Sequence, residues 1–316
     1  MNSGLLLPPP PPVQDAGSRS FRTLTAAHEL AAQIAPISQC IQMTPGRVDG
    51  SIESVHLAGL TLYETSINRG IELRFLDDPN ALVVGVLLGE GRAIAAGQEW
   101  DPSRVLLAPE SQVELTSLGA MRALWLRLER ERVSSALGDG AASAASHRAM
   151  LVDARRFDAT VTIAKRLLQR GGVHLERELE TALVATLRSL IVPVAKDSSR
   201  EMRSLALVRS VETYMWENVE EPLTLERICS DLHCGIRGLI YAFKDIYGVG
   251  PMTYWKACRL NGAHRALRAS MGMVPILEIA ADYGFWHMGH FSADHKHLFG
   301  MTPSEAIEMG RQTAIR

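Results

Sequence analysis

ILEIAADYGFWHMGHFSADHKHLFGMTPSEA, residues 276–306, has the pattern of two short helices joined by a tight turn. Pro275 suits the first turn of the first helix, and Gly284 supplies the backbone freedom that the turn requires. The second helix is predicted over residues 287–299, because Gly300 can take the left-handed conformation that ends a helix. The stretch therefore predicts a helix-turn-helix unit.

A second unit of the same plan lies about 51 residues upstream. Thr224 suits the N-cap of a helix over residues 225–232, and His233 falls at the turn. The following helix is predicted over residues 236–247 and stops at Gly248. A long helix joins the two units, and two such units held about 34 Å apart read successive turns on one face of a DNA duplex.

The C-terminal part resembles the AraC/XylS family of transcription regulators. The resemblance rests on LTLERICSDL (223–232), on RGLIYAFKDIYGVGPMTYWKACRLNGAHRAL (237–267) and above all on the opening stretch. Within that stretch the family pattern is matched by Ile279-Ala280, Gly284-Phe285, Phe291, Phe299-Gly300 and Thr302-Pro303. The resemblance implies a double helix-turn-helix domain over residues 202–310, which binds double-stranded DNA, and a regulator that activates transcription by recruiting RNA polymerase.

Helical position assigns a DNA-facing side to each second helix. The first would offer Arg237, Ile240, Tyr241 and Lys244, while Leu239 and Phe243 point inward. We expect Arg237 to read a base, guanine by preference, and Lys244 to hold a phosphate. The other helix would offer His287, Met288, His290 and Lys296, with Phe285, Phe291 and Phe299 in the core.

The charge of this region is unusual for a DNA-binding domain. The whole chain carries a formal charge of -2, and residues 202–316 contain 12 Lys+Arg against 12 Asp+Glu. The family usually has a small polar cap where this chain has Gly235, and arginine where it has Tyr241 and Ala293. Local contacts, histidines or a second copy must therefore supply the affinity.

The N-terminal half predicts a β-domain over residues 21–137. Residues 21–41 have helical spacing, but residues 71–75 alternate as a strand with one buried face does, and residues 81–88 are a continuous apolar run. Turn residues recur at intervals of about ten, which is typical of a small sandwich or barrel. Resemblance to the family implies a cupin-like, effector-sensing domain, so the fold class is α+β.

A small-molecule site in this β-domain needs aromatic walls and a few polar anchors. The candidates for such an effector site are His56, Tyr63, Glu64, Trp100 and Trp125. The clustered histidines and glutamate of metal-binding cupins are missing from this sequence, so catalysis by the domain is not expected. The sequence does not identify the effector.

Residues 151–192 predict a helical hairpin. Each helix exposes more apolar face than a hairpin buries alone, so we expect it to dock on the β-domain or on a second copy, which makes a homodimer. Residues 138–146 and 193–200 read as linkers, and residues 1–20 as a disordered proline-rich tail rather than a signal peptide. No stretch reaches the roughly 18 apolar residues of a membrane span, and we expect a cytoplasmic protein.

No metal or cofactor is expected. His287, His290, His295 and His297 could converge on zinc, but the site would need three or four ligands, so solvent-facing or DNA-facing histidines are favoured. Cys229 and Cys234 could be a redox pair, but five residues across a helix end place them on different faces, which favours simple packing.

An enzyme is not expected, because the sequence has no GxSxG, no Gly-rich phosphate loop and no HExxH. Two alternatives remain open at this point. One is a cupin-type metal enzyme with an accessory helical domain, and the other is a dimeric scaffold that has lost DNA binding.

Overall fold

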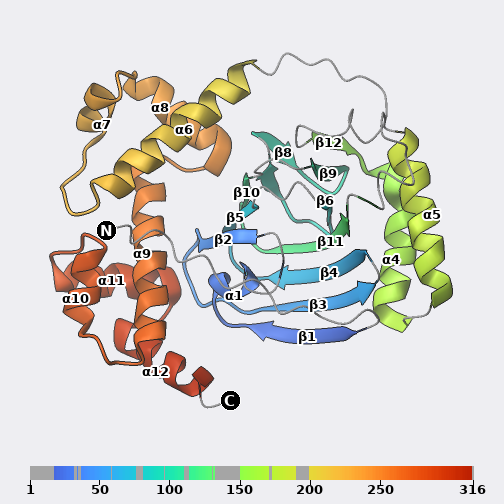
Figure 1. Ribbon diagram of the computed structural model, residues 1–316. Helices are drawn as coiled ribbons and strands as arrows, with labels where there is room; N and C mark the ends of the chain where they lie inside the picture. Colours follow the sequence, from blue (N-terminus) through green and yellow to red (C-terminus); the bar gives the residue numbers. More distant parts are fainter. Residues whose placement is uncertain are drawn as a thin grey trace.

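The computed structural model describes residues 18–31, 34, 37–57, 59–75, 81–95, 97–109, 114–129, 131, 150–170, 173–189 and 199–314. Two antiparallel sheets form the middle of the molecule, with a helical hairpin on one side and the C-terminal helices on the other (Figure 1). This is the expected α+β fold. Residues 1–17 of the expected tail, the linker over residues 138–146 and residues 193–198 of the second linker lie outside the described residues. The ends of two of these predictions are wrong, because residues 19 and 20 of the expected tail belong to β1 and residues 199 and 200 of the expected linker belong to α6. Among the described helices, none is long and apolar enough to cross a membrane.

The larger sheet has seven strands in the order β1-β3-β4-β11-β6-β9-β12. These strands are β1 (Arg19–Leu24), β3 (Gly50–Leu57), β4 (Leu60–Ile67), β11 (Met121–Glu129), β6 (Ala81–Leu87), β9 (Arg104–Pro109) and β12 (Met150–Asp153). Every residue of β6 is buried. Its continuous apolar run is explained by packing on both faces of the sheet.

The smaller sheet has five strands in the order β2-β5-β10-β7-β8. They are β2 (Ile37–Gln42), β5 (Ile71–Phe75), β10 (Glu114–Ser117), β7 (Ala93–Ala95) and β8 (Gln98–Trp100). One face packs against the larger sheet around Trp100 and Trp125, whose rings lie 5.8 Å apart. Gly85 makes room for them, since a Cβ there would lie 2.7 Å from Trp125.

The helical hairpin covers the other face of the seven-stranded sheet (Figure 1). A short 3-10 turn, η1 (Ala154–Phe157), leads into α4 (Asp158–Arg170) and then α5 (Val173–Ser189). Their buried leucines and alanine pack against apolar side chains of the sheet, the helices contributing Ala164, Leu167, Leu168, Leu179, Leu183 and Leu187. The hairpin was expected to dock on the β-domain or on a second copy of the chain, and in the structure it docks on the β-domain.

Two expectations for secondary structure are wrong. The helix-like spacing over residues 21–41 belongs to strand β1, a single helical turn α1 (Ala27–Ala31) and strand β2. The segment expected to begin the hairpin starts instead with β12, which pairs with β9. In both places an edge strand pairs with residues far away in the sequence, and short apolar runs do not reveal such a partner.

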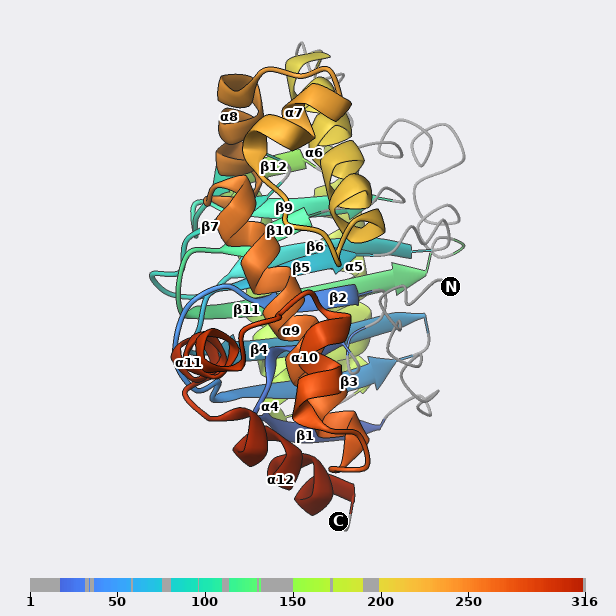
Figure 2. The ribbon, with the colours of Figure 1, turned by 90° about the vertical axis from the view of Figure 1, so that its left-hand side faces the viewer.

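The C-terminal part is all helical, with two helix-turn-helix units at opposite ends of one long helix (Figure 2). The helices are α6 (Ser199–Glu217), α7 (Leu225–Asp231), α8 (Ile236–Tyr247), α9 (Pro251–Ser270), α10 (Ile276–Asp282), α11 (Met288–Phe299) and α12 (Pro303–Ala314). The first unit is α7 with α8, and the second is α10 with α11. Separate apolar cores hold the two units, and α9 contributes to both.

Candidate DNA-binding surface

The first unit is built by local capping. The side chain of Thr224 accepts a hydrogen bond from the amide of Arg227 at 3.2 Å and so starts α7. Helix α8 ends at Gly248, which is left-handed at φ 72°. Leu239 and Phe243 are fully buried, as their helical positions predict.

The outer face of α8 presents three of the four predicted contact residues to solvent. Arg237, Tyr241 and Lys244 are exposed one above the other, and the Arg237 guanidinium lies 5.9 Å from the centre of the Tyr241 ring. Ile240 is half-buried at the edge of this face. An arginine fork and a lysine on one helix face suit a guanine edge and a phosphate.

The second unit repeats this plan with a different outer face. Helix α11 starts at Met288, and His287 is its N-cap without a side-chain capping bond, one residue later than expected. Phe285, Phe291 and Phe299 form the predicted core. The exposed predicted residues are His287, His290 and Lys296, while Met288 is half-buried against the core.

One expectation about the histidine cluster is wrong, because His295 is fully buried. Its Nδ1 lies 2.9 Å from the carbonyl of Met301, and its Nε2 lies 3.1 Å from His264 Nδ1. A carbonyl only accepts, so His295 Nδ1 carries the proton and Nε2 accepts from His264. Burial lowers the pKa of His295 to about 4, so it is a neutral core residue at neutral pH.

The other three histidines of the cluster, His287, His290 and His297, are exposed, and the rings of His287 and His290 lie 6.0 Å apart. Within the part of the chain that the structure describes, no three His, Cys, Asp or Glu side chains are placed to hold a metal ion.

A large residue beside the second recognition helix was missed by the sequence reasoning. Trp286 is 61% exposed and comes directly before His287, at the end of α11 that carries His290. Its buried neighbour Phe285 packs under the Arg259 guanidinium at 4.7 Å, and Arg259 Nη1 donates to the carbonyl of Gly284 at 3.1 Å. These contacts hold the turn in place, while the Trp286 side chain lies at the surface. The sequence signal that could have identified it is its position within residues 276–306.

The structure does not bring the five predicted effector residues together. Tyr63, Trp100 and Trp125 fill the space between the sheets, and the two indole nitrogens donate to Arg104 and Thr65. His56 stands beside Tyr63 at 6.0 Å between rings. Glu64 is not among them, since it pairs with exposed Arg122. Neighbouring residues of β4 point to opposite faces of the sheet, so Tyr63 and Glu64 do not line one pocket.

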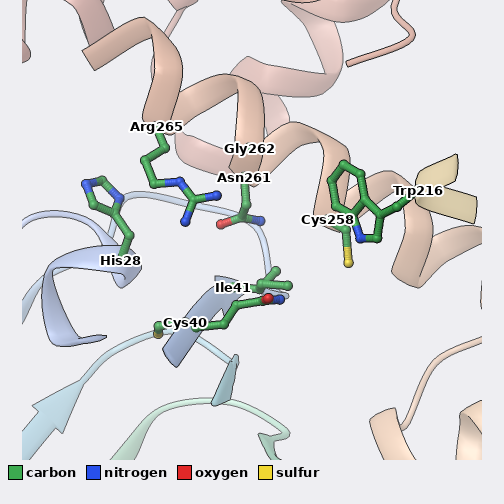
Figure 3. A pocket seen from close by; sticks show the side chains of 9 residues that line it. His28, Cys40, Ile41, Trp216, Cys258, Asn261, Gly262 and Arg265 are labelled. Atoms are coloured by element: carbon green, nitrogen blue, oxygen red, sulfur yellow. The ribbon is translucent and has the colours of Figure 1, made fainter. Parts of the chain in front are cut away.

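A cavity occurs instead where the β-domain meets the long helix α9 (Figure 3). The space it encloses is about 10 Å³, which is room for a single water molecule. The lining comes from α1 and β2 on one side and from α6 and α9 on the other, namely His28, Gln39, Cys40, Ile41, Trp216, Cys258, Asn261, Gly262 and Arg265. Residues of both domains therefore meet in one hollow.

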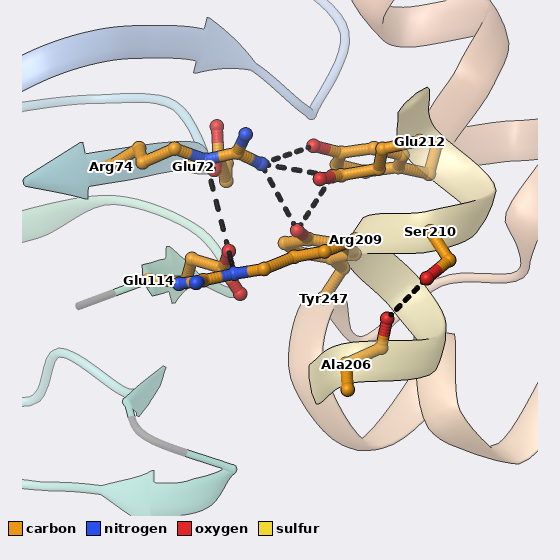
Figure 4. A network of polar contacts seen from close by, with 9 residues as sticks. Glu72, Arg74, Glu114, Ala206, Arg209, Ser210, Glu212 and Tyr247 are labelled. Carbon is orange, nitrogen blue, oxygen red and sulfur yellow. Dashed lines mark hydrogen bonds and ion pairs between the residues drawn. The ribbon is translucent and has the colours of Figure 1, made fainter. Parts of the chain in front are cut away.

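Buried charges join the β-domain to the first unit (Figure 4). Arg74 on β5 donates to Glu212 on α6 at 2.8 Å and to the hydroxyls of Tyr247 and Tyr254 at 3.1 and 3.2 Å. Tyr247, the last residue of α8, also donates to Glu212 at 2.7 Å. The β-domain thus holds the C-terminal end of the first recognition helix.

Two further carboxylates lie beneath this network. Glu72 is fully buried next to Arg74, and Glu114 lies 3.6 Å from Arg209 on α6. Burial raises the pKa of Glu72 to about 8, against the lowering effect of Arg74, and it also raises the pKa of Glu114. The polar face of β5, which the alternating pattern predicted to be exposed, is covered by the C-terminal domain.

Hydrogen bonds from Gln42, Gly46 and Arg47 hold the end of the second recognition helix. The carbonyl of Leu298 accepts from Gln42 Nε2 at 2.6 Å and from the Gly46 amide at 3.0 Å. Arg47 donates to the Gly300 carbonyl at 3.1 Å. On α9, the amide group of Asn261 bonds the main chain of Gln42 in both directions, at 2.9 and 3.0 Å, as a neighbouring strand does.

Two helix-turn-helix units at the ends of one helix, each with an exposed second helix, define a double helix-turn-helix DNA-binding domain. A sequence model of a helix-turn-helix domain family matches residues 228–309. The probable thc operon regulatory protein of Rhodococcus erythropolis is 32% identical over 102 residues, which are 32% of this chain and 31% of that protein. XylDLEGF operon transcriptional activator 2 of Pseudomonas putida is 26% identical over 147 residues, 46% of this chain and 92% of that protein.

Solved structures are also similar to parts of this chain. A probable AraC family transcriptional regulator from Rhodopseudomonas palustris is 32% identical, covers 33% of this chain and 97% of its own, and has a TM-score of 0.30. The AraC-like transcriptional activator CuxR is 15% identical over 67% of this chain and 80% of its own, with a TM-score of 0.38. Through its C-terminal domain the chain belongs to the AraC/XylS family. It spans about a third of the length of the thc operon relative.

Proposed function

We propose that the protein is a sequence-specific DNA-binding regulator of transcription that reads two successive major grooves with α8 and α11. The observation that carries this proposal is the exposure of Arg237, Tyr241 and Lys244 on α8, and of His290 and Lys296 on α11, while the β-domain docks behind them. In this proposal Arg237 reads a base and Lys244 and Lys296 hold phosphates.

The β-domain senses a small-molecule effector in this proposal. Its contacts end on the last residues of both recognition helices, at Tyr247 and at Leu298, so a change in docking reaches both reading surfaces. The cavity between α1, β2 and α9 lies on this same boundary. An effector that binds one docking state better than another shifts the balance between them.

We further infer that the protein works as a homodimer that recruits RNA polymerase and activates transcription. Relatives that share sequence with this chain are named as transcriptional activators. A neutral C-terminal domain gains less from phosphate attraction than a basic one, so a second copy on an adjacent site adds affinity that one chain lacks.

Selection of operators from random DNA duplexes tests the proposal. The full chain should enrich one motif with two half-sites about one helical turn apart. Arg237→Ala should weaken binding to that motif and relax one base position, whereas Arg311→Ala, an exposed arginine on α12, should not. Failure to enrich any motif with the reduced, dimeric protein would favour a scaffold that has lost DNA binding. Metal recovered in fixed ratio with the purified chain would favour the cupin-type enzyme.

A further inference from the structure

Two thiols meet in the turn of the first helix-turn-helix unit. Cys229 lies near the end of α7, and Cys234 lies directly before the residue that caps α8. The Cys234 amide donates to the carbonyl of Cys229 at 3.0 Å, and the His233 amide donates to that of Ser230 at 3.4 Å. With His233 at φ 51°, this is a Schellman motif, in which the side chains before and after the left-handed residue pack together.

The expectation that these cysteines lie on different faces is therefore wrong. The left-handed residue folds the chain back, and the side chains of Cys229 and Cys234 lie close together in the same apolar cluster. The second unit has the same motif, in which the Phe285 amide donates to the carbonyl of Ala280 at 2.9 Å. This kind of turn therefore brings together the side chains before and after its left-handed residue. In the first unit both of these residues are cysteines.

We propose that Cys229 and Cys234 form a redox-active dithiol, which a low-molecular-weight disulfide oxidises to an intramolecular disulfide that weakens DNA binding. Disulfides join residues whose Cα atoms lie roughly 4.4–6.8 Å apart, and a shared main-chain hydrogen bond with neighbouring thiols suits that geometry. Cys234 is half-buried and Cys229 is buried. An oxidant therefore meets Cys234 first.

Oxidised glutathione forms the disulfide in two thiol–disulfide exchange steps. The Cys234 thiolate attacks one sulfur, the S–S bond of the oxidant breaks, and one glutathione leaves as its thiolate and takes up the proton. Cys229 then releases its proton to solvent and attacks the Cys234 sulfur, which expels the second glutathione as a thiolate that takes up a proton. Burial and the contact with Cys234 raise the pKa of Cys229 to about 11, so this second step is the slower one.

Oxidation acts on DNA binding through the start of α8. Gly235 caps this helix without any side-chain hydrogen bond, so the turn contributes directly to the position of its first residues. A disulfide draws the two sulfur atoms to about 2.05 Å, closer than two thiols in contact, and pulls Cys234 toward α7. Arg237 follows three residues later. This consequence rests on the proposed function, whereas the thiol chemistry does not.

Thiol counting tests the dithiol itself. The full chain is equilibrated with oxidised and reduced glutathione, denatured, alkylated and analysed by peptide mass mapping. We expect reactive thiols to fall from four to two, with Cys229 and Cys234 joined and Cys40 and Cys258 alkylated. Cys234→Ser should keep all three of its remaining thiols. Retention of four thiols in the wild-type chain, or pairing with another cysteine, would overturn the proposal.

DNA binding tests the consequence, using an operator selected with the reduced chain. We expect the oxidised chain to bind at least tenfold more weakly, full recovery in dithiothreitol, and no response in Cys234→Ser or Cys229→Ser. Disulfide formation with unchanged affinity would overturn the switch. If the reduced chain selects no operator, the proposed function fails while the thiol count still decides the dithiol.

Discussion

The two helix-turn-helix units share a skeleton and differ in their outer surface. First helices start 51 residues apart, at Leu225 and Ile276, and second helices start 52 apart, at Ile236 and Met288. Each second helix has 12 residues and ends at a left-handed glycine. At equivalent positions the cores match, with Leu239 against Phe291, Phe243 against His295, and Tyr247 against Phe299.

The exposed positions do not match. Where α8 carries Arg237 and Tyr241, α11 carries Gly289 and Ala293. Only the lysines agree, Lys244 with Lys296. Packing fixes the inner face of both helices, while nothing in the fold constrains the outer face. We therefore expect the first unit to carry most of the sequence specificity and the second to contribute mainly phosphate contacts and the side chains of His290 and Trp286.

The largest expected effect is a loss of folding stability that distinguishes the turn of the second unit from that of the first. A Cβ on Gly284 would lie 2.3 Å from the carbonyl oxygen of Val219, and φ is 72° there, so Gly284→Ala should destabilise the C-terminal domain by about 2–4 kcal/mol. The first unit already has a side chain at this position, since His233 takes φ 51°. His233→Gly should thus be neutral or slightly stabilising. Urea unfolding of both variants measures this contrast, and equal losses would show that the turns are equivalent.

The next largest expected effect is on specific DNA binding, and it compares the DNA-facing sides of α8 and α11. Arg237→Ala should cost about 1–3 kcal/mol of specific binding and relax one base position. Gly289→Ala, at the equivalent place in α11 where a Cβ meets open space, should change affinity by less than a factor of about three. Fluorescence anisotropy at fixed salt gives both numbers. A larger loss from the second variant would reverse the assignment of specificity.

A smaller effect concerns how each unit docks on the β-domain. The pKa of Glu72 is raised to about 8, so docking at the first unit retains a proton that the separated, solvated carboxyl releases. Docking is then strongest well below pH 8 and weakens as pH rises from 6.5 to 8.5, by on the order of 1 kcal/mol per unit below the pKa. Arg74, Glu114, Glu212 and Gln39 surround the group.

The second unit should not respond in that range. Gln42 and Asn261 do not titrate, and burial lowers the pKa of His28 to about 4. Hydrogen exchange at the ends of α8 and α11, followed between pH 6.5 and 8.5 and corrected for intrinsic rates, should show increased opening at α8 alone. Glu72→Gln should reduce the trend and leave only the part due to Glu114, whose pKa burial also raises. Equal opening at both helix ends would contradict it.

The smallest expected effect is a gain in DNA affinity when a positive charge is added to α11. Ala293→Arg on the exposed face of α11 should tighten binding by a few tenths to about 1 kcal/mol and steepen the salt dependence by about one counterion. Tyr241→Arg is the matched change on α8. Salt titrations of both variants measure the slopes, and an unchanged slope for Ala293→Arg would mean that this face does not approach a phosphate.

The C-terminal domain was predictable because its signals are local. The cap at Thr224 and the glycines at 248 and 300 fix helix ends within one residue of expectation. Burial of His295 was not predictable, because its partner His264 lies on another helix. The exposed positions of Arg237 and Lys244 follow from helical period, but what they touch in DNA does not.

The β-domain was predicted as a class and not in detail. Strand β2 owes its place to β5 and to Asn261, 219 residues from its partner Gln42. No local pattern reports such pairing, so residues 21–41 looked helical. The predicted effector residues are divided between two faces for a related reason, since Glu64 and Tyr63 are neighbours in sequence but face opposite sides of the sheet.

The connecting helix α9 sets the distance between the two helix-turn-helix units. It has 20 residues and so measures about 30 Å, close to one repeat of the double helix. The β-domain contacts α9 near its start, where Arg74 donates to Tyr254, and near its end, where Arg268 pairs with Glu29. One extra base pair between half-sites rotates the second by roughly 35°. If α8 and α11 read one operator as proposed, a helix held at both ends does not follow that rotation, and we expect the spacing between half-sites to matter as much as their sequence.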